Sequence, residues 1–166
     1  GTLGFIINKD IINTGFTTPE SVELQGMLRL LKDSKINYAI LEVSSHSLEQ
    51  SRVNDVDFDV AIFTNLTQDH LDFHESMENY FKAKSKLFLG LDAKNYSVIN
   101  IDDYYGNLLF NSINCNKISY GFNSEADISV NDIFLSLDGT QISINIFKED
   151  FTIQTNLIGD YNISNI

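Results

Sequence analysis

Two kinds of apolar pattern follow one another along the first 120 residues, one with helical spacing and one of short continuous runs. Leu24, Met27, Leu28 and Leu31 recur at the spacing i, i+3, i+4, i+7, which predicts an amphipathic helix over 19–34, with Thr18 as its N-cap. Short, near-continuous apolar runs instead predict strands covered on both faces. The predicted elements are a hairpin at 3–12, strands at 38–43, 60–64, 98–101 and 116–120, helical segments at 19–34, 44–51, 76–90 and 103–112, and a polar loop at 65–75. Alternating strands and helices are typical of a parallel sheet with right-handed crossovers.

From residue 127 onward the apolar pattern has a period of two, which is the pattern of half-buried strands. The alternating positions are Ile128 and Val130, then Ile142, Ile144 and Ile146, then Phe151, Ile153, Thr155 and Leu157. Asp138-Gly139 between two of these runs is a hairpin turn signal. We therefore predict an α/β fold, a mostly parallel sheet flanked by helices over 1–122, with a small antiparallel β-sheet appended over 123–160.

Charge and composition exclude several classes of function. The 166 residues carry 11 Lys and Arg against 23 Asp and Glu, a net charge of −12. Such a charge argues against binding nucleic acid or an anionic membrane surface, which both require clustered basic residues. No apolar run approaches the ~20 residues of a membrane span. The single cysteine, Cys115, leaves no internal disulfide and fits a reducing, cytoplasmic location.

Polar side chains follow two of the predicted strands, where ligand sites form in open α/β sheets. Glu42 lies in the apolar run 40–43, so its carboxylate either binds a cation or pairs, or else faces solvent or caps a helix at the strand end. His70 and His74 are spaced i, i+4 with Asp69 and Asp72 nearby. Zinc is poorly supported without cysteines, and Mg²⁺ or Mn²⁺ suits oxygen ligands plus one His better. The alternative to a metal site is that these four side chains are ordinary solvent-exposed loop residues.

Lys84 falls in the middle of the apolar stripe of the predicted helix at 76–90, whereas Lys82 and Lys86 point to the opposite side. A lysine in this position extends to the edge of the stripe, is paired, or is kept neutral by a depressed pKa. A neutral amine can form a Schiff base or take up CO₂ as a carbamate. The chain contains no G-x-x-x-x-G-K-[ST] loop, so it cannot hold a triphosphate in that manner by itself.

Five blocks of the sequence form a recognisable set. They are 17–20 (TTPE), 42–53 (EVSSHSLEQSRV), 63–74 (FTNLTQDHLDFH), 80–84 (YFKAK) and 157–165 (LIGDYNISN). Together these blocks resemble the central domain of the Mur ligases, which is a P-loop-NTPase-like domain. Block 42–53 is most similar to the branch that adds the third residue of the peptidoglycan stem peptide. The resemblance implies an ATP-dependent amide ligase of the bacterial cell wall. Its substrates would be UDP-MurNAc-L-Ala-D-Glu and an amino acid, lysine or meso-diaminopimelate, joined through an acyl phosphate.

The resemblance also assigns site residues. Glu42 and His70 match Mg²⁺ ligands, and Lys84 matches a lysine carried as a carbamate that helps to position the metal, so these three are the expected catalytic residues. The positions that match residues holding the UDP-muramoyl-dipeptide are Thr17, Thr18, Ser44, Gln50 and Arg52. Asn162 and Asn165 match residues near the adenine of ATP. Asn65 and Asp69 are expected in the pocket without a firm role.

The resemblance places the P-loop upstream of Thr2 and two further domains outside this chain. Because the chain starts at Gly1 and ends in mid-pattern, we expect it to be part of a longer protein, inactive as a ligase alone, with 161–166 as the start of a truncated helix. An exposed sheet edge or face would then favour self-association.

Three alternatives stay open at this point. One is another member of the Mur ligase superfamily, of the folylpolyglutamate or cyanophycin synthetase type. A second is a non-catalytic binding domain, and a third is a zinc hydrolase using His46, His70 and His74.

Overall fold

The computed structural model describes residues 1–7, 10–136, 138–159 and 162–163. The chain forms two compact units, one of Gly1–Asp57 with His70–Leu87 and the other of Phe58–Asp69 with Phe88–Ile166. The division at 122 and 160 made from the sequence stays a prediction. Among the described residues, no helix has the length and apolar character needed to cross a membrane.

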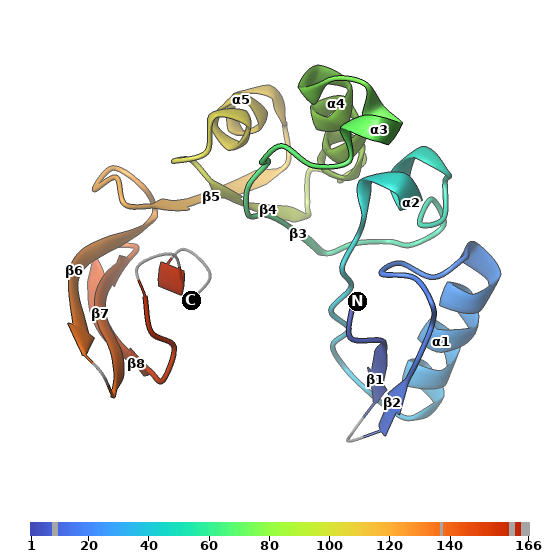
Figure 1. Cartoon of the computed structure of the whole chain (residues 1–166), viewed down its shortest axis with the longest axis horizontal. Helices are drawn as coiled ribbons and strands as arrows, with labels where there is room; N and C mark the ends of the chain where they lie inside the picture. Colours follow the sequence, from blue (N-terminus) through green and yellow to red (C-terminus); the bar gives the residue numbers. More distant parts are fainter. Residues whose placement is uncertain (8–9, 137, 160–161, 164–166) are drawn as a thin grey trace. The chain divides into compact units, whose positions relative to one another are not determined.

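The first unit combines an antiparallel hairpin with helices. Its elements are β1 (Phe5–Ile7), β2 (Asp10–Ile12), α1 (Ser21–Asp33), α2 (Ser45–Glu49), α3 (Leu71–His74) and α4 (Met77–Leu89), whose last two residues belong to the second unit. The predicted hairpin is confirmed, with Phe5 paired to Ile12 and Ile7 to Asp10. Figure 1 shows α1 running beside this hairpin.

Helix α1 confirms the prediction from the apolar spacing, but its start is different. Glu20, not Thr18, occupies the N-cap position, and its side chain makes no capping hydrogen bond. The hydroxyl of Thr18 instead donates to the carbonyl of Glu42 at 2.8 Å and accepts the backbone N–H of Ser44 at 3.0 Å. The predicted cap is wrong because this buried hydroxyl connects two distant segments of the chain.

The second unit is a mixed six-stranded sheet in the order β3-β4-β5-β6-β7-β8. The strands are β3 (Val60–Phe63), β4 (Tyr96–Asn100), β5 (Asn116–Gly121), β6 (Ile128–Ser136), β7 (Gly139–Ile146) and β8 (Glu149–Thr155). The first three pairings are parallel and the last two antiparallel, which confirms the mostly parallel core and the antiparallel end.

The antiparallel strands continue the parallel sheet and do not form a sheet of their own. The connection is fixed by Asp127, whose carboxylate accepts the backbone N–H and the hydroxyl of Ser119, each at 2.8 Å. The backbone N–H of Asp127 donates back to the Ser119 hydroxyl at 2.9 Å. These bonds hold β6 against the end of β5, where Tyr120 pairs with Ile128.

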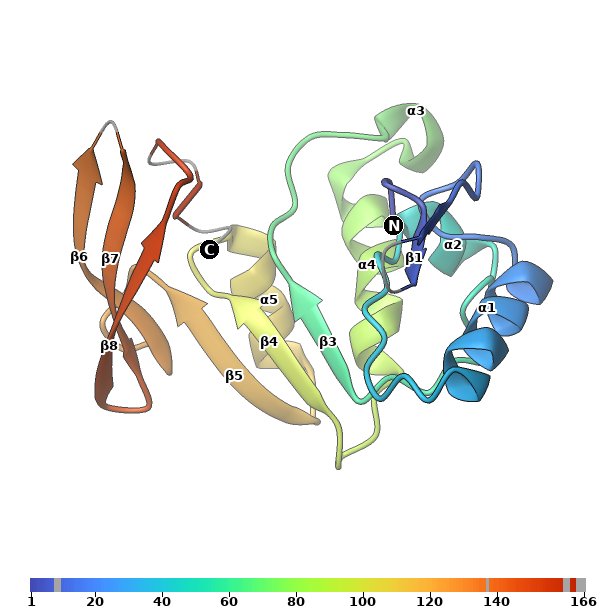
Figure 2. The same cartoon turned by 90° about the horizontal axis from the view of Figure 1, so that it is seen from below.

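Helix α5 (Tyr104–Ser112) covers one face of this sheet (Figure 2). Asp103 caps it by accepting the backbone N–H of Gly106 at 2.9 Å. A Cβ at Gly106 would lie 2.0 Å from the carbonyl oxygen of Asn100, so only glycine permits this close packing. The opposite face is open at β3, where Ile62 is 62% exposed, so the prediction of strands covered on both faces is wrong there.

Two further predictions from the sequence are wrong. Residues 38–43 form no strand, and Ile40 is fully exposed, because an apolar segment becomes a strand only when a neighbour pairs with its backbone. No such neighbour is found among the described residues. The predicted loop at 65–75 contains α3, which follows His70 in a left-handed conformation with φ 53°.

Candidate functional site

The residues that the resemblance assigns to the muramoyl substrate lie together in the first unit. The hydroxyl of Thr18 donates to the carbonyl of Glu42 and accepts the backbone N–H of Ser44. Ser44 is the N-cap of α2, and its side chain accepts the backbone N–H of Ser47 at 3.2 Å. The hydroxyl of Thr17 lies 3.4 Å from that of Thr2. A continuous polar network therefore runs from the N-terminal turn to the start of α2.

Arg52 is held firmly at the end of this network. Its Nη1 donates to the carbonyl of Thr18 at 3.0 Å, and its Nη2 donates to the Gln50 side chain and lies 2.9 Å from a carboxylate oxygen of Glu20. The guanidinium carbon sits 4.9 Å from the centre of the Phe16 ring. The Nε atom is buried, with no hydrogen-bond partner among the described residues. The guanidinium is thus oriented and retains an unused donor.

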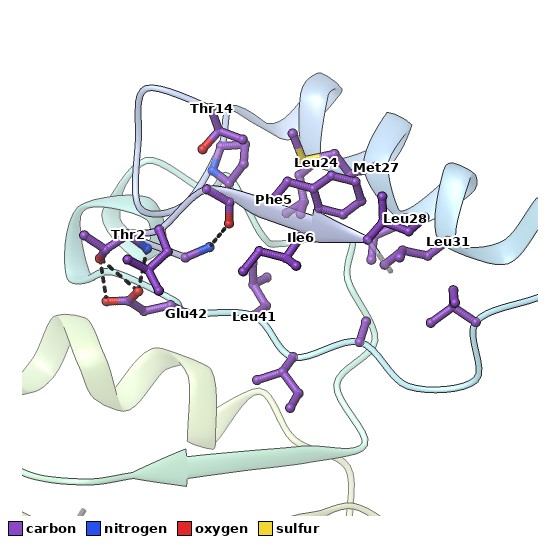
Figure 3. Close-up of a pocket in the computed structure, with 18 of the residues that line it drawn as sticks. Thr2, Phe5, Ile6, Thr14, Leu24, Met27, Leu28, Leu31, Leu41 and Glu42 are labelled. Carbon is purple, nitrogen blue, oxygen red and sulfur yellow. Dashed lines mark hydrogen bonds between the residues drawn. The ribbon is translucent and has the colours of Figure 1, made fainter. Parts of the chain in front are cut away.

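Glu42 is exposed and is bound by the N-terminal turn. Its carboxylate accepts the backbone N–H of Thr2 at 2.8 Å and the Thr2 hydroxyl at 3.0 and 3.2 Å (Figure 3). Glu42 thus faces solvent, as one alternative from the sequence allowed, but it caps the N-terminal turn and not a helix. The turn is closed by a bond from the Gly4 N–H to the Gly1 carbonyl at 2.8 Å.

A cavity of about 520 Å³ opens beside Glu42. Its apolar wall comes from α1, the β1 strand and the segment before Glu42, and Figure 3 shows Leu24, Met27 and Leu28 facing Phe5. Thr2, Thr14 and Glu42 are the polar groups at its rim. This lining suits packing against apolar groups more than binding of a charged ligand.

Five aromatic rings from α2, α3, α4 and the residue before α3 form a cluster in the same unit. The ring of His46 lies 5.1 Å from His70, 4.1 Å from Phe73 and 5.7 Å from His74, measured between centroids. The His74 ring stacks on Tyr80 at 4.9 Å and 19°. The predicted i, i+4 histidine pair is therefore brought into one cluster.

His74 is the buried member of this cluster, with 5% of its surface exposed. Its Nε2 lies 2.8 Å from the hydroxyl of Ser45, which is also buried. Burial lowers the pKa of His74 below its ordinary value of 6.5, and the nearby His46, His70 and Lys84 lower it further, against an opposing effect of Glu49. These effects favour the neutral form of the His74 imidazole.

Lys84 is half-buried on α4, and Lys82 and Lys86 are exposed, as the apolar stripe predicts. Its Nζ lies 5.5 Å from the centre of the Tyr80 ring, within cation–π range. His70 approaches the same ring edge-on at 6.1 Å. Lys84 and His70 thus both lie against Tyr80.

The described residues contain no group of three carboxylate, imidazole or thiol side chains placed to hold a metal ion. This arrangement gives no support to a zinc site of His46, His70 and His74. His70 alone supplies one nitrogen donor, and an unmodified Lys84 supplies none to a cation. A carbamate on Lys84 would supply carboxylate-like oxygens, which with an imidazole nitrogen form a donor set suited to Mg²⁺.

The remaining expected residues belong to the second unit or are not described. Asn162 donates its side-chain amide to the carbonyl of Ile158 at 2.9 Å. Asn165 lies outside the residues that the structure describes. Asn65 and Asp69 are exposed and belong to the second unit.

Sequence reasoning missed several contacts that shape the site. Thr2 binds Glu42, Glu20 and Phe16 hold Arg52, and Ser45 holds His74. Glu20 stands within the TTPE block and Ser45 next to Ser44, so their position in the motifs was a signal. Thr2 and Phe16 carry no comparable signal, because their contacts depend on how distant segments meet.

Comparison with known proteins gives matches over the whole chain. The Mur ligase middle domain profile matches residues 1–166. A UDP-N-acetylmuramoyl-L-alanyl-D-glutamate–2,6-diaminopimelate ligase from Clostridium botulinum is 46% identical over 165 residues, which cover 99% of this chain and 34% of that protein. The chain thus spans about a third of the length of this relative.

Solved structures agree with this assignment. A structure of a ligase of the same name superimposes with a TM-score of 0.88 at 31% identity, over 99% of this chain and 34% of the other. A complex of FPGS with AMPPCP shares the fold alone, at 12% identity and a TM-score of 0.55, over 87% of this chain and 41% of the other. The chain belongs to the Mur ligase middle domain family.

Proposed function

We propose that this chain is the central part of an ATP-dependent ligase that joins 2,6-diaminopimelate to UDP-MurNAc-L-Ala-D-Glu in peptidoglycan synthesis. The amide bond would form through an acyl phosphate on the substrate carboxylate. The observation that carries the proposal is the gathering of Thr17, Thr18, Ser44, Gln50 and Arg52 in one hydrogen-bonded network. The similarity to diaminopimelate ligases supports the choice of amino acid.

In this proposal Arg52 binds an anionic group of the muramoyl-dipeptide. Its guanidinium is fixed by Thr18, Gln50 and Glu20, so little side-chain entropy is lost when the substrate binds. The buried Nε is an unused donor, and a carboxylate or phosphate oxygen can reach it only if substrate binding shifts the neighbouring side chains. The neighbouring hydroxyls of Thr17 and Ser44 add short polar contacts.

Lys84, His70 and Glu42 are proposed as the electrostatic part of the site. Lys84 would carry a carbamate, and its oxygens with the His70 imidazole would hold Mg²⁺. Bound Mg²⁺ would neutralise negative charge that develops on the phosphoryl and carboxylate oxygens. For Glu42 to bind Mg²⁺, its carboxylate must give up the hydrogen bond from the Thr2 N–H and bind the cation in its place. Asn162 and Asn165 are proposed to lie near the adenine of ATP.

The alternatives are less well supported. A folylpolyglutamate-type activity is matched only by the shared fold at 12% identity. A purely binding domain has no need of Glu42, His70 and Lys84 together.

A chimera tests the proposal. This chain replaces the matching 165-residue segment of the Clostridium botulinum relative, and phosphate release is measured with both substrates and with each omitted. We expect turnover that requires UDP-MurNAc-L-Ala-D-Glu and 2,6-diaminopimelate together, and none from the 166-residue chain alone. A folded chimera without turnover would contradict the proposal.

A further inference from the structure

A chain of contacts in the first unit leads from α2 through His74 to α4. The Ser45 hydroxyl lies 2.8 Å from Nε2 of His74, and the two side chains are only 2% and 5% exposed. The imidazole stacks on the Tyr80 ring at 4.9 Å and 19°. Tyr80 in turn lies below Nζ of Lys84 at 5.5 Å and against His70 at 6.1 Å.

His74 is fixed at its backbone as well as at its ring. Its N–H donates to the carbonyl of His70 at 3.0 Å, and its carbonyl accepts the Asn79 side chain at 3.0 Å. The buried imidazole packs nearly parallel to the Tyr80 ring, at 4.9 Å and 19°. The position of the Tyr80 ring therefore depends on His74.

Tyr80 is placed to control two other side chains. Lys84 is one helical turn further along α4, so the ring lies where the lysine side chain would otherwise sample other rotamers. His70 precedes α3 with φ 53°, a conformation rarely adopted by non-glycine residues, and its ring meets the edge of Tyr80. Both side chains therefore lie against the same ring.

We propose that His74 is a positioning residue that acts through the Tyr80 ring to hold Lys84 and His70 at the separation a bound cation needs. Ser45 anchors His74 and directly follows Ser44, so the same contacts connect the cation ligands to the segment that binds the muramoyl substrate. This inference rests on the proposed function, in which Lys84 and His70 are those ligands.

The test compares paired variants in the active chimera. Tyr80→Leu and His74→Ala remove the stacked rings, whereas Tyr80→Phe and His74→Phe retain them. The readouts are the Mg²⁺ concentration at half-maximal turnover, the ¹³C NMR signal of a lysine carbamate formed from ¹³C-bicarbonate, and the KM for the muramoyl substrate. Tyr104→Leu makes the same change on a ring that is 70% exposed in the second unit and serves as the control.

We expect Tyr80→Leu and His74→Ala to raise the Mg²⁺ requirement about tenfold or more, as loss of groups that orient metal ligands commonly does. The carbamate signal should fall, and the KM for the muramoyl substrate should stay the same. Tyr80→Phe should remain close to the wild type, and His74→Phe, which retains the ring but not the bond to Ser45, should lose less than His74→Ala. Should His74→Ala not fold, the two Tyr80 variants carry the test.

Two results would overturn the inference while leaving the proposed function intact. One is an unchanged Mg²⁺ requirement and carbamate signal in folded Tyr80→Leu. The other is an equal loss in Tyr80→Leu and Tyr80→Phe, which would show that the effect does not come from the stacked ring. If the wild-type chimera has no turnover, the proposed function fails, and the inference fails with it.

Discussion

The guanidinium of Arg52 donates to the backbone carbonyl of Thr18 at 3.0 Å, although 34 positions separate the two residues in the sequence. The other terminal nitrogen, Nη2, donates to the side chain of Gln50 and forms an ion pair with Glu20. This geometry requires a planar group with several donors, which lysine does not have.

Arg52→Lys should raise the KM for the muramoyl substrate about tenfold in the chimera, because losing a hydrogen bond to a charged group costs roughly 1.5–3 kcal/mol. The KM for ATP should change little. Initial rates at varied concentrations of each substrate measure both constants. Equal increases in the two KM values would contradict the assigned role of Arg52.

Thr18→Val should destabilise the chain. Valine has the same shape as threonine, but it leaves the carbonyl of Glu42 and the N–H of Ser44 without the buried hydroxyl that joins them. Unsatisfied buried polar groups cost about 1–3 kcal/mol each. Urea denaturation measures the loss, and Thr18→Ser, which retains the hydroxyl, should lose less. Equal stability of the valine variant and the wild type would contradict this account.

The stability of the chain should fall as the pH drops below about 6.5. The folded state lowers the pKa of His74 below its ordinary value of 6.5, so below that pH the unfolded chain binds the proton more readily. One such group contributes a slope of at most ~1.4 kcal/mol per pH unit. Unfolding free energies between pH 5 and 8 should show this slope in the wild type and a smaller one in His74→Asn. Identical slopes would exclude His74 as the cause.

We propose that the isolated chain self-associates through residues 38–43. Tyr38 is 89% exposed and Ile40 is fully exposed, and this segment has no strand partner among the described residues. Exposed apolar segments without a backbone partner favour pairing between copies. Sedimentation velocity should detect oligomers that Ile40→Lys reduces. Val22→Lys, on a residue of α1 that is 85% exposed, should have no such effect. A wild-type chain that stays monomeric at all concentrations would contradict the proposal.

Periodic apolar patterns predicted the elements that pack within each unit. The spacing of Leu24, Met27, Leu28 and Leu31 gave α1, and the alternation after residue 127 gave the antiparallel strands. Both signals work because one face of an element is buried against its neighbours. The segment 38–43 has the same apolar content, but apolar content does not provide a hydrogen-bonding neighbour.

Motifs placed the candidate site better than local patterns did. The five residues that the resemblance assigns to the substrate lie together, because the blocks at 17–20 and 42–53 fold against each other through Thr18. Their role in binding stays a prediction. The carboxylate of Glu42 and the ring cluster around His74 were ambiguous in the sequence. Their surroundings depend on contacts between segments, such as Thr2 with Glu42 and Ser45 with His74, that no local pattern records.

The central claim is that Lys84 acts as a carbamate in a Mur-type ligation, and one measurement tests it most directly. Phosphate release by the Lys84→Ala chimera is measured with and without a small carboxylate such as acetate, with Lys82→Ala on the exposed face of α4 as the control. We predict almost no turnover by folded Lys84→Ala, partial recovery with acetate and normal turnover by Lys82→Ala. Turnover by Lys84→Ala at the wild-type rate would contradict the account.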